Sequence, residues 1–166
     1  MKVLVPMDAT SAALAPLRHI EWLRRAGVAM EVVLLNAQPR FDRCTAHYTA
    51  RAARAALRAE RSAAAMAGAM EAMSLADIPF RAVAEVGPPA ERIAAVAERE
   101  AVDEIMIGVG RHAPWLRLVR PSIAQGVIAR TDIPVTVFAR GRAGALERYG
   151  LPSGLAALAA LLFAAD

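Results

Sequence analysis

Cysteine, lysine and long apolar runs are scarce in this sequence. Cys44 is the only cysteine, which excludes an internal disulfide bond and fits a reducing compartment. No apolar run reaches the length of a membrane span. The opening residues, MKVLVPMD, are interrupted by Pro6 and Asp8 too soon to act as a signal peptide. We therefore expect a cytoplasmic protein with no membrane partner.

Lysine is almost absent, because Lys2 is the only one among 20 basic residues. The net charge is +4, and an arginine-rich basic set suits phosphate or carboxylate partners, since a guanidinium makes planar, bidentate contacts. A GC-rich genome would also produce many arginines and alanines. Net charge bears on solubility before function, so the composition identifies no partner.

The length and composition indicate one folded domain. The chain has 166 residues, of which 57% are hydrophobic and 22% charged. A chain of this length buries a sufficient core without a metal or a disulfide. The composition is typical of a folded protein and not of a disordered one.

Strand-like and helix-like segments alternate along the chain. Apolar runs predict strands at 2–7, 30–38, 79–87, 101–108 and 134–138. Helical periodicity or proline placement predicts helices at about 11–26, 50–73 and 88–100, and a short helix that Ser122 opens. The strand runs are continuously apolar, which indicates burial on both faces, as in a parallel sheet covered by helices. The sequence thus predicts an α/β domain with five parallel strands.

Four segments resemble the universal stress protein family. VPMDATS is similar to the start of the family, and EVGPPAERIAAVAE to its third strand and the next helix. VDEIMIGVGR is similar to the strand that enters its nucleotide loop, and PSIAQGVIARTDIPVTVF to its last helix and strand. They occur in the family's order and spacing over nearly the whole of the first 140 residues. The resemblance implies a flavodoxin-like, Rossmann-type open sheet of order 3-2-1-4-5, with helices on both faces.

The loop after the fourth predicted strand departs from the family pattern. Nucleotide-binding members have a glycine, two residues, a glycine, nine residues, and then a glycine and a serine or threonine. Gly108 and Ser122 match the first and last positions, but Arg111 and Pro121 stand where the other two glycines would be. Pro121 has no N–H to donate to a phosphate, and Arg111 adds a Cβ where the backbone would approach the ligand. The resemblance therefore implies a degraded ATP site.

Other parts of the family's nucleotide site have counterparts here. The resemblance implies that Asp8 would face the ribose or base, and that the backbone near Asn36 and Ala37 would face the adenine. Ser122 and Ile123 would open the helix whose N-terminal amides favour an anion. Arginines in the loop also offer positive charge, so binding of ATP or AMP remains an alternative.

The leading hypothesis is a non-enzymatic stress-response protein with a degraded ATP site and unknown protein partners. The alternative is an ATP- or AMP-binding sensor of the same family, with slow hydrolysis at most. The sequence has no paired nucleophile and base, no Walker motif and no dinucleotide fingerprint, which disfavours an enzyme. His19, His47 and His112 are far apart, which disfavours a metal site.

The last predicted strand favours a homodimer. It is rich in β-branched and aromatic residues, carries no charge and would lie at the edge of the sheet. The resemblance implies that it pairs with its copy across a two-fold axis. The residues of this dimer strand are Val135, Thr136, Val137 and Phe138.

The segment after the predicted domain, 1–140, is expected to be a linker followed by an apolar C-terminal helix or tail, 141–166. Ser153 can cap a helix over 154–164 that is apolar on all sides. Such a helix would lie in a groove of its own domain or of a partner subunit, unless the tail is frayed.

Two sets of residues recur at helical spacing on the predicted helix 50–73. One is an arginine stripe: Arg51, Arg54, Arg58 and Arg61. The other is a methionine set: Met66, Met70 and Met73. We expect the arginines to form a solvated face, since no nucleic-acid-binding motif accompanies them, and the methionines to pack on the sheet.

Overall fold

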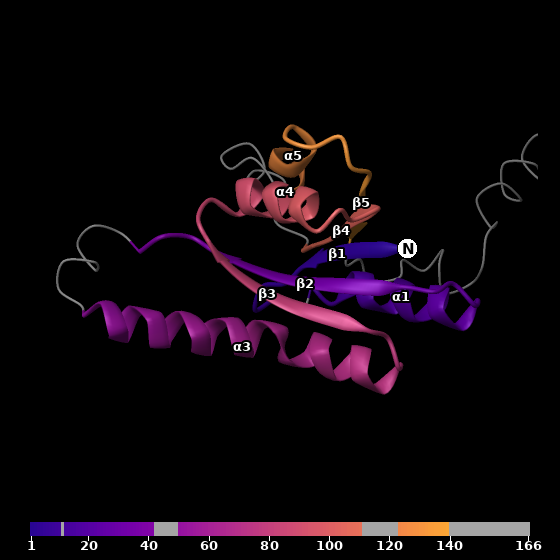
Figure 1. Ribbon diagram of the computed structural model, residues 1–166, viewed down its shortest axis with the longest axis horizontal. Coiled ribbons are helices and arrows are strands. Elements are labelled where there is room, and N and C mark those ends of the chain that lie inside the picture. The colour runs from indigo at the N-terminus through magenta and orange to yellow at the C-terminus, as the bar shows by residue number, and fades with distance from the viewer. Residues whose placement is uncertain (11, 42–49, 111–122, 140–166) are drawn as a thin grey trace, which may run out of the picture.

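The chain forms a five-stranded parallel sheet with helices on both faces (Figure 1). This computed structural model describes residues 1–10, 12–41, 50–110 and 123–139. The strand order is β3-β2-β1-β4-β5, as the sequence predicted. The strands are β1 (Lys2–Pro6), β2 (Glu31–Gln38), β3 (Phe80–Val86), β4 (Glu104–Val109) and β5 (Val135–Ala139). The helices are α1 (Ala15–Arg25), α3 (Arg51–Leu75), α4 (Pro89–Arg99) and α5 (Ile123–Ile128).

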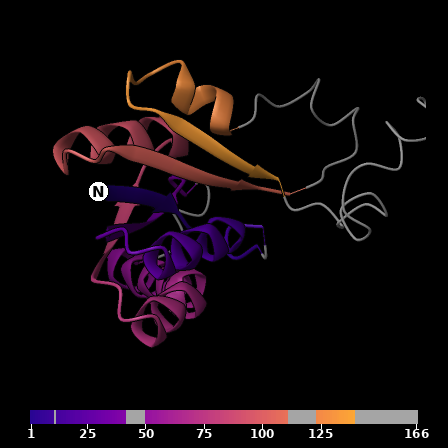
Figure 2. The same cartoon turned by 90° about the vertical axis from the view of Figure 1, so that its right-hand side faces the viewer.

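The helices divide between the two faces of the sheet. Figures 1 and 2 show α1 and α3 on one side and α4 and α5 on the other. Successive residues of a strand point to opposite faces, so the central strands supply both cores. On β1, Val3 and Val5 pack with α1 and α3, whereas Leu4 packs with α4 and α5. The continuous apolar runs are therefore explained by burial on two faces.

The two edge strands are more exposed than the sequence suggested. On β3, Arg81, Ala82 and Ala84 are exposed, and on β5, Thr136 and Val137 are exposed. An edge strand has a neighbour on one side only, and the flanking helices pack mainly over the centre of the sheet. The expectation of burial on both faces was thus correct for β1, β2 and β4 and wrong for the two edges.

The first helix begins later than the sequence indicated. It starts at Ala15, four residues after the predicted start, and Pro16 lies in its first turn, where a missing N–H leaves no hydrogen bond broken. Ala12 and Ala13 precede the helix and are buried. The segment from β1 to α1 therefore packs against the sheet before the helix begins.

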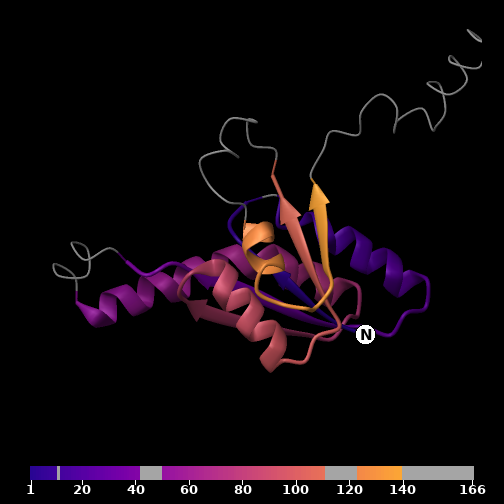
Figure 3. The ribbon, with the colours of Figure 1, turned by 90° about the horizontal axis from the view of Figure 1, so that it is seen from above.

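The long helix α3 packs on the sheet through its second half. Met66 and Met73 are buried in the core beside β1 and β2, and Met70 is partly buried against it, which confirms the expected packing. The first turns of α3 extend past the strands (Figure 3), and exposed residues predominate there. This overhang places one side of α3 beside the carboxyl end of β2.

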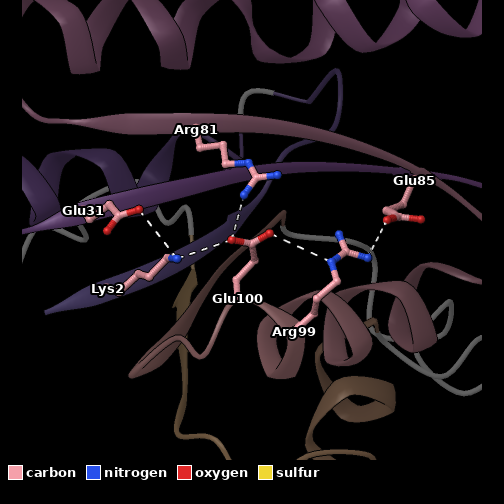
Figure 4. Close-up of polar contacts among 6 residues, drawn as sticks. All are labelled: Lys2, Glu31, Arg81, Glu85, Arg99 and Glu100. Atoms are coloured by element: carbon pink, nitrogen blue, oxygen red, sulfur yellow. Dashed lines mark hydrogen bonds and ion pairs between the residues drawn. The ribbon is translucent and has the colours of Figure 1, made fainter.

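A network of ion pairs joins β1, β2 and β3 to the carboxyl-terminal end of α4. Its members are Lys2, Glu31, Arg81, Glu85, Arg99 and Glu100 (Figure 4). The Glu100 side chain is only 8% exposed, and its Oε2 lies 3.3 Å from Lys2 Nζ and 3.2 Å from Arg81 Nη1. Glu100 is thus the acceptor that connects β1, β3 and α4.

No helix in the described part of the chain is long and apolar enough to cross a membrane. The predicted tail, 141–166, lies outside the described residues.

Candidate functional site

A pocket of about 550 Å³ lies at the carboxyl ends of β1 and β2, beside α3. This is the edge at which open parallel sheets bind ligands, and the volume is ordinary for a small-molecule site. The lining residues are Asp8, Ala9, Asn36, Ala37, Gln38, Pro39, Arg40, Phe41, Arg61, Ala64 and Ala65.

The strand register explains why Asp8 and Ala37 meet in this pocket. Pro6 pairs with Leu35, and the Met7 N–H donates to the Leu35 carbonyl at 2.7 Å, so residue 8 continues alongside the end of β2. Asp8 Oδ1 accepts hydrogen bonds from the backbone N–H of Thr10 at 2.8 Å and from its hydroxyl at 2.5 Å. This turn fixes the carboxylate, while no described residue donates to Oδ2. Asp8 therefore retains an acceptor oxygen for a ligand.

Two side-chain amides hold the floor of the pocket in place. Asn36 is buried, and its Nδ2 donates to the Met7 carbonyl at 2.8 Å. Gln38 Nε2 donates to Asn36 Oδ1 at 2.8 Å and to the Arg58 carbonyl at 2.9 Å. This chain of bonds connects β1, β2 and α3. The pocket is therefore formed by three elements whose relative positions are fixed by satisfied polar groups.

An aromatic ring forms one wall of the pocket between β2 and α3. The Arg58 guanidinium lies 4.6 Å from the centre of the Phe41 ring, and that of Arg61 lies 6.0 Å from it. Both distances allow a cation–π interaction. Arg54 and Arg58 are half-buried, so the expectation that the whole arginine stripe is solvated was wrong at these two positions.

Gly108 does not line this pocket, although the family resemblance assigns it to the nucleotide loop. A Cβ at this position would lie 2.0 Å from the carbonyl oxygen and 2.8 Å from the carbonyl carbon of Ala12. The backbone that precedes α1 therefore passes directly over β4 at Gly108. Packing alone requires glycine here, whether or not a phosphate binds nearby.

Of the remaining predicted nucleotide-site residues, the structure describes only Ile123. Ile123 opens the six-residue helix α5, where it is 48% exposed, and does not line the pocket. Arg111, Pro121 and Ser122 lie outside the described residues. Of the predicted nucleotide residues, the pocket thus brings together Asp8 and Ala37.

The sequence of residues 1–139 matches the Universal stress protein family. The match extends over more than half of the chain. This chain belongs to the universal stress protein family. No curated protein matches it.

Solved structures share the fold of this universal stress protein. The hypothetical protein MJ0577 is 24% identical, with 85% of this chain and 96% of that chain covered, and a TM-score of 0.67. A family member from Burkholderia pseudomallei is 19% identical, with coverages of 82% and 93% and a TM-score of 0.58. A family member from Arabidopsis thaliana with AMP bound is 15% identical, with coverages of 94% and 98% and a TM-score of 0.62. These likenesses establish the flavodoxin-like, Rossmann-type architecture.

Arg40, Phe41 and Arg61 are among the pocket residues of this universal stress protein that its sequence did not indicate as site residues. Phe41 follows β2 by three residues, and Arg61 belongs to the arginine stripe of α3. The sequence pattern that could have indicated them is an aromatic residue just after a strand, followed by arginines on one helix face. Whether such residues line a pocket depends on how α3 crosses the end of β2, which helical spacing alone does not specify.

Proposed function

We propose that this universal stress protein acts as a non-enzymatic stress-response protein whose phosphate-binding loop is degraded for ATP. The observation that carries this proposal is the contact between Gly108 and Ala12. Gly108 is the one glycine of the loop that matches the family pattern. Its contact with Ala12 gives it a packing role that does not depend on a nucleotide. Arg111 and Pro121 replace the other two glycines, and Pro121 lacks the N–H that a phosphate oxygen would accept.

In this proposal, the retained part of the site is the pocket between β1, β2 and α3. Asp8 offers a free carboxylate oxygen, and Ala37 offers strand-end backbone, as the family resemblance implies for the nucleoside half of a ligand. Loss of one hydrogen bond to a charged phosphate weakens binding by about 1.5–3 kcal/mol, or one to two decades in affinity. A chain that keeps the pocket and loses loop contacts would therefore bind ATP weakly.

The alternative function is an adenine-nucleotide sensor. The presence of the pocket favours it, and two similar folds were solved with AMP and with cAMP bound. Loop arginines such as Arg111 would then supply the charge that the missing glycines do not.

Chromatography of the small molecules released from the denatured, purified protein distinguishes the two functions. The leading proposal predicts no stoichiometric ATP or AMP and at most a small rise in melting temperature when ATP is added, since the stabilisation that a ligand gives to the native state decreases as its Kd increases. Stoichiometric ATP or AMP would overturn the leading proposal in favour of the sensor.

A double substitution, Arg111→Gly/Pro121→Gly, tests whether these two loop residues are the reason that ATP binds weakly. It restores the family's glycines beside Gly108 and Ser122 and should increase ATP affinity by one decade or more, measured by calorimetry. An unchanged affinity would show that ATP binding is blocked elsewhere.

We also propose that the protein functions as a homodimer paired through β5. The exposed edge of this strand carries no charged residue, and Val137 is 44% exposed. Beside it, His19 of α1 lies 5.3 Å from the Phe138 ring and 5.6 Å from the Trp22 ring, measured between ring centres. Trp22 is itself 59% exposed, so the apolar surface continues from β5 onto α1. Such an edge favours pairing with a second strand.

A further inference from the structure

Three aromatic rings form an apolar surface where α1 meets β5. The His19 ring of α1 lies 5.6 Å from the Trp22 ring and 5.3 Å from the Phe138 ring of β5, measured between ring centres. Trp22 is 59% exposed, and Phe138 is only partly buried against the core. Covering such rings with another apolar group is favourable, because it removes apolar area from water. We call these three rings the aromatic surface.

The two sides of β5 differ in how they are covered. On one side, Val135 packs with Ala124 and Val127 of α5. Successive residues of a strand point to opposite sides, so Thr136 and Phe138 lie on the other side, which faces α1 (Figure 2). Thr136 is exposed there. Among the described elements, α1 thus covers this side of β5 only in part.

The chain leaves the sheet beside the aromatic surface. Strand β5 ends at Ala139, the residue after Phe138. Each earlier strand is followed along the chain by a helix that packs on the sheet: α1 after β1, α3 after β2, α4 after β3 and α5 after β4. After β5, residues 140–153 include charged side chains, whereas residues 154–164 include none. A helix over this uncharged segment would need an apolar surface to cover its side chains.

At helical spacing, the segment 154–164 has one side of leucines and one side of alanines. Leu155, Leu158 and Leu162 would form a leucine stripe, and Ala160 would lie opposite it. A helix over this range would be about 16 Å long, and the five residues of β5 span about 17 Å. Residues 140–153 can extend over about 45 Å, which is enough to bring the segment back along β5. The leucine stripe therefore matches the aromatic surface in chemistry and β5 in length.

We propose that the leucine stripe docks on the aromatic surface of its own chain, so that the segment 154–164 lies on the α1 side of β5. Docking would cover Trp22 and would leave the outer edge of β5 free, so it is compatible with the proposed dimer. It does not depend on whether the protein binds ATP. The described core clusters already bury the central strands, so the segment should undock in urea before the domain unfolds.

Quenching of Trp22 fluorescence by acrylamide in the full-length chain tests the docking. Every protein carries Trp115→Phe, because Trp22 and Trp115 are the two tryptophans of the sequence. Leu158→Asp should raise the quenching constant of Trp22 about twofold or more, because a carboxylate in the leucine stripe shifts the population to the undocked form. Ala160→Asp is the matched control, since it adds the same charge to the opposite side of the segment and should leave the quenching constant unchanged. Circular dichroism verifies that each variant is folded.

A further variant determines which chain supplies the segment. Val137 lies on the α5 side of β5, and Val137→Asp is expected to separate the proposed dimer. If the segment docks on its own chain, Trp22 should remain as protected in this variant as in the parent protein. Light scattering on the same samples gives the mass of the species that is measured.

Chemical cross-linking gives a second measurement that does not depend on fluorescence. In a Cys44→Ser background, a thiol-selective cross-linker should join the pair Thr136→Cys/Leu158→Cys within one chain, because both positions would lie on the α1 side of β5. The pair Val137→Cys/Leu158→Cys is the control and should react less, because residue 137 points to the opposite side. Mass spectrometry separates products of one chain from products of two.

Unchanged quenching of Trp22 in Leu158→Asp would overturn the proposal, as would an equal increase in Ala160→Asp. Loss of protection in Val137→Asp would also overturn it, since the covering segment would then come from the partner subunit. Equal cross-linking yields at positions 136 and 137 would show that the segment has no preferred place on β5.

Discussion

At the scale of single residues, the structure explains the glycine at position 108 by packing and not by ligand binding. Because a Cβ there would lie 2.0 Å from the Ala12 carbonyl oxygen, Gly108→Ala must displace the segment before α1 or shift β4. We expect the free energy of unfolding to fall by about 1–3 kcal/mol or more, as for overpacked cores. Urea denaturation followed by circular dichroism measures the change.

Gly68 provides the matched control for this substitution. It lies inside α3, where a Cβ would meet nothing within 4 Å. Gly68→Ala should stabilise the protein by about 0.5–1 kcal/mol, because alanine loses less backbone entropy in a helix. If both substitutions changed the free energy of unfolding by the same small amount, packing would no longer explain why position 108 requires a glycine.

Glu100 is the second residue at which we expect a substitution to lower the free energy of unfolding substantially. Glu100→Gln removes the charge between Lys2 and Arg81 while preserving the size of the side chain. We expect a loss of about 1–3 kcal/mol in unfolding free energy, because charge-assisted bonds to a nearly buried acceptor are lost. Thermal and urea unfolding at low salt measure it.

The control for Glu100 is an exposed ion pair on α1. Glu21 lies 3.3 Å from Arg25, whose side chain is 77% exposed. Glu21→Gln should change stability by less than about 0.5 kcal/mol, as is usual for solvated helix pairs. A comparable loss in both variants would mean that Glu100 is no better placed than a surface carboxylate.

At the scale of elements, the proposed dimer can be tested by a substitution on β5. In a β5-paired dimer, Val137→Asp places two carboxylates near the two-fold axis, so the chains should separate while remaining folded. Light scattering at micromolar concentration should give twice the 17.6 kDa chain mass for the native protein and the single mass for the variant.

The opposite edge of the sheet offers a control for β5. Ala82 is exposed on β3, and Ala82→Asp should leave the dimer intact. A monomeric native protein would exclude the proposed dimer, and a variant at Val137 that stays dimeric would exclude this strand as its interface.

Elements could be predicted from the sequence where one local signal dominates. The apolar run of β2 and the methionine spacing on α3 specify a strand and a buried helix face without other information. The start of α1 was predicted four residues too early, because small residues such as Ala12 and Ala13 are compatible with a helix. The position of Ala12 and Ala13 depends on their packing against Gly108 of β4, which is distant in the sequence.

The candidate site could be predicted only in part. Asp8 and Ala37 were implied by the family resemblance, and both lie in the pocket at strand ends that meet at one edge of the parallel sheet. Arg61 could not be placed, because helical spacing relates it to other arginines and not to the sheet. Its position depends on how far α3 extends past β2, which is a property of the tertiary packing.

At the scale of the whole molecule, the domain boundary can be tested by truncation. The core clusters on both faces draw on described residues between Val3 and Phe138. A chain ending at Arg140 should therefore fold, with a urea midpoint close to that of the full chain. Insolubility or a much lower midpoint would show that residues 141–166 are part of the folded domain.

The ion-pair network also has a consequence for chemical labelling. Lys2 carries the only side-chain amine of the protein, and in the native state Glu31 and Glu100 hold it in place. The terminal amine of Met1 donates to the Ala29 carbonyl at 3.0 Å. Both acylation targets thus lie at the start of the central strand. The extent of acylation by an amine-selective reagent, read by mass spectrometry, would therefore report when β1 separates from its neighbours.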